Sequence, residues 1–172
     1  MKIFKDKKTK DIIFICITLI SLLEWYFAYK IANKYAGIYN IGIFILFIGQ
    51  PIYYKALFKN QNAYLKLKII AIGLILFISP LIIYYTLPKY TYDEGKQIVQ
   101  RYVHSSRNTV FIDISKEKDT VPLVNNPEQL FVSNRAYYYE IKSTIGNKYF
   151  MVNPLTGKVV QMPKDYWTVD EK

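Results

Sequence analysis

The segment Ala136–Met162, "AYYYEIKSTIGNKYFMVNPLTGKVVQM", carries the clearest strand pattern in the chain. It holds three runs of strand-forming residues, separated by two short polar stretches that contain glycine, as hairpins commonly do. Alternate residues of a strand face opposite sides of a sheet. The segment therefore predicts a meander of three antiparallel strands, in which Tyr137 and Tyr139 share one face while Tyr138 and Glu140 share the other.

The second polar stretch, "NPLTG", has the composition of a tight turn. Asparagine favours turn positions, and the ring of a proline presets its φ angle. Glycine adopts a left-handed conformation without a steric penalty. We therefore expect a structural turn formed by Asn153, Pro154 and Gly157, with a positive φ angle at Gly157.

A helix is expected upstream of the meander, over "TYDEGKQIVQRYV" (Thr91–Val103). Thr91 and Glu94 have the spacing of a capping box, which satisfies backbone N–H groups at a helix start. Ile98 and Val99 belong to an apolar stripe, and Gly95 lies on the same side, where a close neighbour fits.

The stretch between the helix and the meander contributes less. "TVFIDI" (109–114) and "LFVSN" (130–134) are short strand candidates, and the polar residues 115–129 with two prolines predict a loop. The second half of the chain thus predicts an α+β domain, with one helix and an antiparallel sheet of about four strands.

The first half of the chain is dominated by three apolar runs, at residues 12–29, 35–54 and 69–88. Each of the last two has 20 residues without a formal charge. A helix rises about 1.5 Å per residue, so 20 residues cover about 30 Å, the hydrocarbon thickness of a bilayer. The runs predict an α-helical membrane protein with three transmembrane helices, and hence the lipid bilayer as a partner.

Lysine placement predicts the orientation of these helices. Nine lysines precede the first run or lie between the second and third, and three lie at the opposite ends of the runs. Positive residues favour the cytoplasmic side. We therefore expect a multi-pass protein of the cell membrane with a cytoplasmic N-terminus. Its expected parts are a basic tail (1–11), the transmembrane part (12–88), an extracytoplasmic domain (89–164) and a C-terminal tail (165–172).

Charge argues against nucleic-acid binding. The chain has a net charge of +10, of which +8 belongs to residues 1–88 and flanks the apolar runs. A nucleic-acid binder needs its cations gathered on one soluble surface. The charge instead has the pattern of membrane orientation.

Two polar residues interrupt the apolar runs at matching places. Glu24 precedes Lys30 by six residues and Asn40 follows Lys34 by six, so antiparallel helices would hold both at similar depth. A carboxylate within the bilayer is costly unless it is paired, protonated or reaches the interface. We expect either a proton- or ligand-responsive pair or, more simply, a carboxylate that reaches the headgroups or bonds to Asn40.

No catalytic constellation can be assembled from the sequence. It contains no HExxH, CxxC, GxGxxG or Walker motif, and its single histidine, His104, adjoins serines that cannot be aimed at it. The single cysteine, Cys16, lies in the first apolar run. We therefore expect no enzyme activity, no cofactor and no metal, and regard the outer face of the meander, at Tyr138 and Glu140, as a candidate partner surface.

The capped helix, the strands and the turn together resemble the PepSY domain family over residues 91–162. The positions that carry the resemblance are Tyr149, Met151, Val152, Asn153, Thr156, Gly157, Lys158 and Val159. Residues 105–135 depart from the family pattern, and Gly95 stands where alanine is commoner. The resemblance implies a non-catalytic module outside the cytoplasm that binds a peptide or inhibits a peptidase.

The sequence thus favours a membrane-anchored extracytoplasmic binding or regulatory module. A second interpretation, from a different class, is a self-protection protein, such as a bacteriocin or toxin immunity factor, that acts through its helices. Small, basic, three-span chains fit that role as well.

Overall fold

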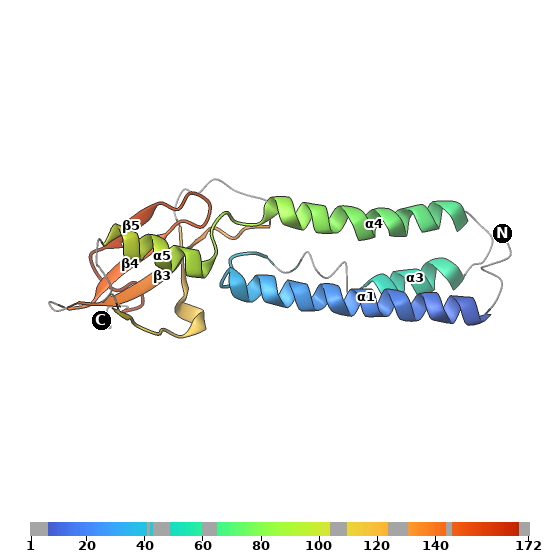
Figure 1. Ribbon diagram of the computed structural model, residues 1–172, viewed down its shortest axis with the longest axis horizontal. Coiled ribbons are helices and arrows are strands. Elements are labelled where there is room, and N and C mark those ends of the chain that lie inside the picture. Colours follow the sequence, from blue (N-terminus) through green and yellow to red (C-terminus); the bar gives the residue numbers. More distant parts are fainter. Residues whose placement is uncertain are drawn as a thin grey trace. The chain divides into compact units, whose positions relative to one another are not determined.

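The chain divides into two compact units in the computed structural model. The first comprises residues 1–30 and 41–86, and the second comprises residues 31–40 and 87–172. The structure describes residues 7–40, 42, 49–59, 65–103, 110–123, 131–143 and 146–168. Figure 1 shows that the helices α1, α3 and α4 make up the first unit, while α5 and the sheet belong to the second.

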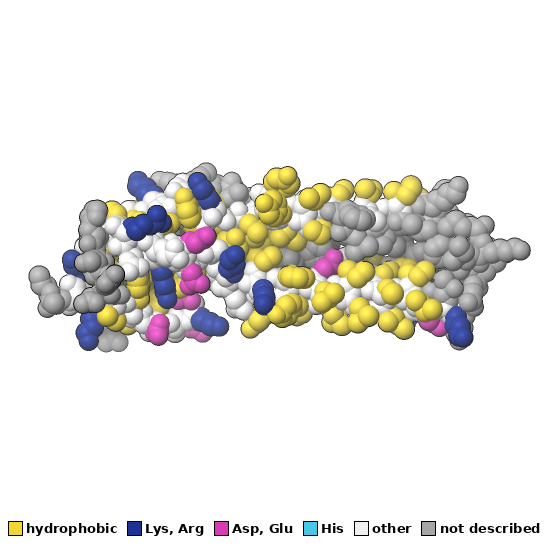
Figure 2. All heavy atoms as spheres, in the orientation of Figure 1, with side chains coloured by type: hydrophobic (Ala, Val, Ile, Leu, Met, Phe, Trp, Pro, Cys, Tyr) yellow, Lys and Arg dark blue, Asp and Glu magenta, His cyan; other side chains and the backbone are white. Residues whose placement is uncertain are grey.

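The first unit contains α1 (Lys7–Lys34) as far as Lys30, together with α3 (Gln50–Lys59) and α4 (Leu65–Thr86). Hydrophobic side chains cover much of the described surface of α1 in Figure 2, and Leu22 and Phe27 each remain 60% exposed. Among the described residues, one segment, Asp11–Lys34, is a helix long and apolar enough to cross a membrane. That segment contains the whole of the first predicted span, residues 12–29. It does not by itself support a multi-pass topology.

The second predicted span, residues 35–54, is not one helix. α1 ends at Lys34, and a turn follows in which Gly37 has a φ angle of +71°. Tyr39 then pairs with Val132, and residues 43–48 lie outside the described part of the chain. Composition misled the prediction because apolar residues that face a protein core are as hydrophobic as residues that face lipid.

The third predicted span, residues 69–88, falls on α4, which is a helix from Leu65 to Thr86 with Pro80 inside it. Its crossing of a membrane stays a prediction. α1 begins at Lys7 and so includes residues 7–11 of the predicted basic tail, and residues 1–6 lie outside the described part of the chain.

The second unit contains a five-stranded antiparallel sheet of β1 (Val110–Phe111), β2 (Thr120–Pro122), β3 (Arg135–Lys142), β4 (Lys148–Val152) and β5 (Val159–Met162). The order is β1-β3-β4-β5, and β2 pairs with β3 on the same edge as β1. The predicted meander is therefore present as β3, β4 and β5. The predicted loop 115–129 contains β2, whose three residues are too few to produce a recognisable alternation.

Helix α5 (Tyr92–Tyr102) packs on one face of this sheet. The predicted capping box is present: the Thr91 side chain accepts from the Glu94 N–H, and the Glu94 carboxylate accepts the Thr91 N–H at 2.7 Å. The close neighbour expected at Gly95 is Tyr139, whose hydroxyl occupies the space that a side chain at residue 95 would need. The structure thus confirms an α+β unit built on one helix and an antiparallel sheet.

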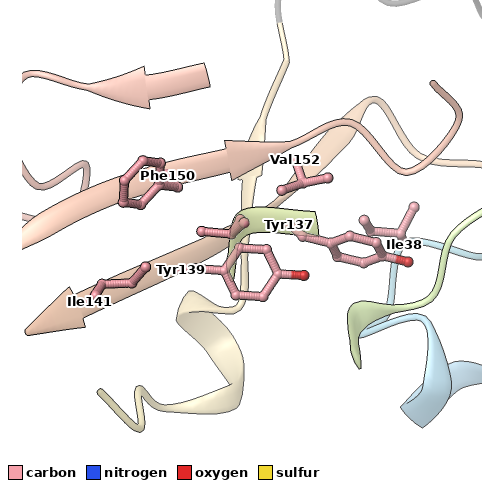
Figure 3. Close-up of a cluster of buried hydrophobic side chains, with 7 residues drawn as sticks. Ile38, Tyr137, Tyr139, Ile141, Phe150 and Val152 are labelled. Carbon is pink, nitrogen blue, oxygen red and sulfur yellow. The ribbon is translucent and has the colours of Figure 1, made fainter. Parts of the chain in front are cut away.

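The core lies between α5 and the sheet. Val99 of α5 is fully buried there, as are Tyr137, Tyr139 and Phe150 on the strands. Figure 3 shows Ile38 beside these strand residues. Because Ile38 is completely buried in this cluster, residues 31–40 belong to the α+β unit, and the domain boundary predicted at residue 89 misses them.

Candidate functional site

The turn between β4 and β5 has the geometry that its composition requires. The Asn153 Oδ1 atom accepts the N–H groups of Leu155 and Thr156, at 2.8 and 3.1 Å. Gly157 has a φ angle of +71°, the positive value expected for it, and its N–H donates to the Asn153 carbonyl oxygen at 2.9 Å. The turn is held by its own backbone and by one side chain.

The turn is also anchored to the start of α5. Pro154 is fully buried, and its carbonyl oxygen accepts the Tyr90 N–H at 3.0 Å. The ring of Tyr90 lies against Gly157, with Cε2 only 2.9 Å from where a β-carbon at residue 157 would stand. Any larger residue at position 157 would therefore meet both an unfavourable φ angle and a ring.

A groove lies where the turn, β5 and α5 meet. It has a volume of about 830 Å³ and is open to solvent. Its described lining consists of Tyr90, Ile98, Arg101, Tyr102, Thr156, Gly157 and Val159. The groove is shallow, and its lining mixes aromatic and aliphatic side chains with polar groups in nearly equal measure.

The groove adjoins an open edge of the sheet, because β5 pairs only with β4 in the described part of the chain. The Asn153 N–H donates to the Lys158 carbonyl oxygen at 3.0 Å, so Lys158 turns its backbone toward β4. Backbone direction alternates along an antiparallel strand. Val159 and Gln161 therefore present their N–H and C=O groups to the unpaired edge.

Arg101 is the one charged side chain in the described lining of the groove. It is exposed, and its Nε–H donates to the Gln97 carbonyl oxygen at 3.4 Å. No acidic side chain accompanies Arg101 in the described lining of the groove. A guanidinium in this state can bind a carboxylate with two parallel hydrogen bonds.

Buried tyrosines hold the segment that positions the groove. The Tyr137 hydroxyl donates to the Tyr90 carbonyl oxygen at 2.8 Å, and the Tyr139 hydroxyl donates to the Tyr92 carbonyl oxygen at 2.6 Å. Burial raises the pKa of Tyr137 and of Tyr139 well above the usual phenol range. Both hydroxyls are therefore protonated at neutral pH and act as donors to the two carbonyl oxygens.

The expected partner surface at Tyr138 is wrong. Tyr138 is only 1% exposed, and its hydroxyl donates a short hydrogen bond to the Asp165 carboxylate. Trp167 packs on the same cluster, and its Nε1–H donates to the Lys118 carbonyl oxygen at 3.1 Å. The predicted C-terminal tail is thus part of the fold over residues 165–168, and it covers the face that strand alternation left open.

Glu140, the other member of that predicted surface, is half-buried on β3. Its Oε1 atom accepts the Asn147 side-chain N–H at 2.7 Å across the β3–β4 hairpin. The side chain therefore bridges two parts of one hairpin.

Glu24 and Asn40, the predicted intramembrane pair, fall in different units. Asn40 is exposed, and its backbone N–H donates to the Phe131 carbonyl oxygen at 2.7 Å. Glu24 instead faces Gln50 of α3, whose Oε1 atom accepts the Ser21 hydroxyl at 3.4 Å. Neither Glu24 Oε2 nor Gln50 Nε2 completes a hydrogen bond of good geometry among the described residues.

The groove itself was missed by the sequence analysis, although its turn and its helix were both recognised. Two of the lining residues, Arg101 and Tyr102, could be seen at the end of the predicted helix. Nothing in the sequence, however, places them in one groove with residues 156–159. His104 lies outside the described residues, and the described residues hold no cluster of three His, Cys, Asp or Glu side chains that could bind a metal.

Comparison with known proteins identifies no relative of this chain. No family model, no curated protein and no solved structure matches the chain.

Proposed function

We propose that this chain is a membrane-anchored module whose α+β unit binds an extended polypeptide segment outside the cytoplasm, without catalysis of its own. The observation that carries the proposal is the groove between α5 and the open edge of β5. Exposed strand edges and helix-flanked grooves are recurring sites of peptide recognition.

The lining of the groove supports a polypeptide in preference to a small polar ligand. Tyr102 is 52% exposed at the groove, and Ile98 and Val159 add apolar surface beside it. Aromatic residues at such sites supply large contact areas at little cost in side-chain entropy. The adjacent unpaired backbone of β5 offers hydrogen bonds that any extended chain can make.

The membrane part of the proposal rests on α1 and on charge. The segment Asp11–Lys34 has the length and hydropathy of a membrane span, and lysine placement favours a cytoplasmic N-terminus with the α+β unit outside. We include in this proposal that three helices cross the membrane and that the α+β unit lies outside the cell. The resemblance to PepSY domains points in the same direction, and it makes a peptidase one class of partner.

The proposal is tested with the full-length protein in detergent micelles, immobilised and exposed to a pool of random octapeptides. We expect the protein to retain a subset of the pool. Replacing Tyr102 by Ala should lower that retention about tenfold, because a well-packed aromatic contact is worth about 1.4 kcal/mol and each such step is a factor of ten.

Tyr166→Ala is the matched control, since Tyr166 is also an exposed tyrosine of the same unit, at 42%, but lies outside the groove. It should retain the pool as the parent protein does. Retention at background level by the parent, or equal losses in the two variants, would show that the groove is not a polypeptide site.

A further inference from the structure

The geometry points to a proton-binding site in the first unit: a neutral Glu24 carboxyl on α1 that pairs with the Gln50 side chain at the start of α3. This site is independent of the groove and of the polypeptide proposed for it. Three observations carry it, namely the contact between the two side chains, the unpaired buried atom on each of them, and the lack of a charged neighbour among the described residues.

A small polar cluster joins α1 to α3. Ser21 and Gln50 are 5% and 6% exposed, and the Ser21 hydroxyl donates to the Gln50 Oε1 atom at 3.4 Å. Residues three apart on a helix are neighbours on one face, so Glu24 lies beside Ser21, and its carboxyl group faces the Gln50 amide. All three residues belong to the same compact unit.

Two atoms of this cluster are buried without a hydrogen-bond partner among the described residues, Glu24 Oε2 and Gln50 Nε2. A buried polar atom that lacks a partner costs free energy, so the two side chains gain if they can pair. The amide nitrogen of a glutamine only donates, whereas its oxygen has two lone pairs, of which Ser21 uses one. Gln50 can therefore donate one more hydrogen bond and accept one more.

A protonated Glu24 matches both of these capacities. Its Oε2 hydroxyl can donate to Gln50 Oε1, while its other oxygen accepts the Gln50 Nε2–H, so that acid and amide each donate once and accept once. An ionised Glu24 can only accept, and it would remain a full charge held by one neutral donor. Burying an unpaired charge is far more costly than burying a neutral acid, above all within a membrane-spanning segment.

No charged side chain in the described part of the chain compensates a carboxylate at this place, since Gln50 is the one side chain there that acts on the Glu24 carboxyl. The other charged or titratable groups to consider on the three helices are Asp11, Lys30, Tyr54, Lys55, Tyr84 and Tyr85. All of these except Tyr54 are exposed. The Lys30 ammonium lies 5.1 Å from the centre of the Tyr26 ring, and the Tyr54 ring lies against Phe14, with 6.3 Å between ring centres.

The cluster fits a proton better than a metal cation. A cation such as Na⁺ would require oxygen atoms that are free to coordinate it, but Gln50 Oε1 already accepts the Ser21 hydroxyl. The Gln50 Nε2 group would also remain unpaired, with its hydrogens next to a positive charge. A proton on Glu24 gives every polar atom of the pair a partner.

Proton binding links the charge of Glu24 to the contact between α1 and α3. The neutral pair holds Gln50, the first residue of α3, against α1 by two hydrogen bonds. Loss of the proton removes the bond from the Glu24 hydroxyl and leaves a charge that water must reach. The pair therefore acts as a latch that is closed while Glu24 carries its proton.

The proton is tested with carbodiimides on the full-length protein in detergent micelles at pH 7. A carbodiimide adds to a protonated carboxyl: the acid proton moves to a nitrogen of the reagent, the carboxyl oxygen bonds to its central carbon, and nothing leaves. We expect dicyclohexylcarbodiimide, which enters apolar regions, to modify Glu24 about tenfold more than a water-soluble carbodiimide does, as peptide mass spectrometry can measure. Asp11 is the matched control, an exposed carboxyl of the same helix, and should show no such preference.

Pairing with Gln50 is tested by infrared spectroscopy at pH 7, in the C=O stretching region of carboxylic acids. Glu24→Gln should remove one band from the spectrum of the parent protein. Gln50→Leu should keep that band but shift it to higher wavenumber, because the acid loses both of its hydrogen bonds. Ser21→Ala is the control, since it removes the bond to Gln50 but neither bond of Glu24, and it should leave the band nearly in place.

Each outcome decides one part of the inference. If dicyclohexylcarbodiimide spares Glu24 and Glu24→Gln removes no band, then Glu24 is ionised and the proton site is overturned. A band that stays in place in Gln50→Leu would overturn the acid–amide pair. Protection of Glu24 when potassium ions in the buffer are replaced by sodium ions would identify a cation site instead. Peptide retention by the groove is a separate measurement, so its success or failure leaves these results unchanged.

Discussion

The two faces of β3 are both covered, but by different kinds of structure. One face lies under α5, a capped helix with a regular apolar stripe. The other lies under the C-terminal residues 163–168, which form bends and reach the sheet through Trp167 and Asp165. Neighbouring tyrosines of one strand, Tyr138 and Tyr139, are therefore equally buried, but one lies under a segment without helix or strand and the other under a helix. Strand alternation identifies the two faces of a sheet, whereas what covers each face depends on contacts between residues distant in the sequence.

The largest effect is expected on the helix-covered face. Tyr139→Ala should lower the free energy of unfolding by about 3–5 kcal/mol, because it removes a buried ring beside Gly95 and the bond to the Tyr92 carbonyl. The measurement is a guanidinium titration of the full-length protein in detergent micelles, followed by near-ultraviolet circular dichroism. A loss below 1 kcal/mol would mean that α5 does not pack on Tyr139.

The same face depends on a residue that the sequence assigns to a membrane span. Ile38→Ala should cost about 2–4 kcal/mol in the same titration, because Ile38 is completely buried in the core of the α+β unit. Ile52→Ala is the matched control, since Ile52 is 70% exposed, and should change the unfolding of the α+β unit little. If the two variants unfold alike, the segment 31–40 does not belong to that core.

On the tail-covered face, Tyr138→Ala should cost about 2–3 kcal/mol. The ring is as buried as that of Tyr139, but a cover without helix or strand can collapse more readily into the space it leaves. A cost under 0.5 kcal/mol is what an exposed tyrosine would give, and that result would restore the surface predicted from the sequence.

The cover of that face can be weakened directly. Trp167→Ala should cost about 1–2 kcal/mol, since Trp167 is half-buried and loses its bond to the Lys118 carbonyl together with its packing. It should also expose Tyr138. In the Trp167→Ala background, Tyr138→Ala should therefore lower the free energy of unfolding by less than it does in the parent protein. Additive costs would show that Trp167 and Tyr138 do not cover each other.

The smallest effect concerns pH. Burial by itself raises the pKa of Asp165, but bonds from the Tyr138 hydroxyl and the Trp167 N–H outweigh it and hold the pKa below the usual aspartate range. A carboxyl whose pKa is lowered by folding adds stability above its unfolded pKa of about 3.9 and loses it as pH falls through the folded value. The stabilisation should be below about 1 kcal/mol, because solvent screens a partly exposed group.

This contribution is measured as the difference in unfolding free energy between the parent and Asp165→Asn, at pH 7 and at pH 3. The difference should shrink at pH 3, where protonation begins to remove the advantage of the carboxylate. A difference that grows on acidification would contradict the sign of the pKa shift.

Local chemistry explains which elements the sequence predicts well. The helix start at Thr91, the turn at Gly157 and the strands on either side of it are each specified by residues within a few positions of one another. Capping, positive φ angles and strand alternation act over that short range. β2 escaped prediction because three residues cannot show a period, and its place in the sheet comes from pairing with Arg135–Tyr137.

By itself, then, the sequence determined the α+β character of the second half, the capped helix, the turn and the presence of long apolar runs. Only the tertiary structure decided that Ile38 belongs to a protein core, that Tyr138 is covered by Trp167, and that Arg101 shares a groove with Val159. The physical reason is that hydrophobic burial is non-directional: an apolar side chain gains from leaving water whether its neighbour is lipid, a helix or a C-terminal segment. Which neighbour it meets is determined by the path of the whole chain.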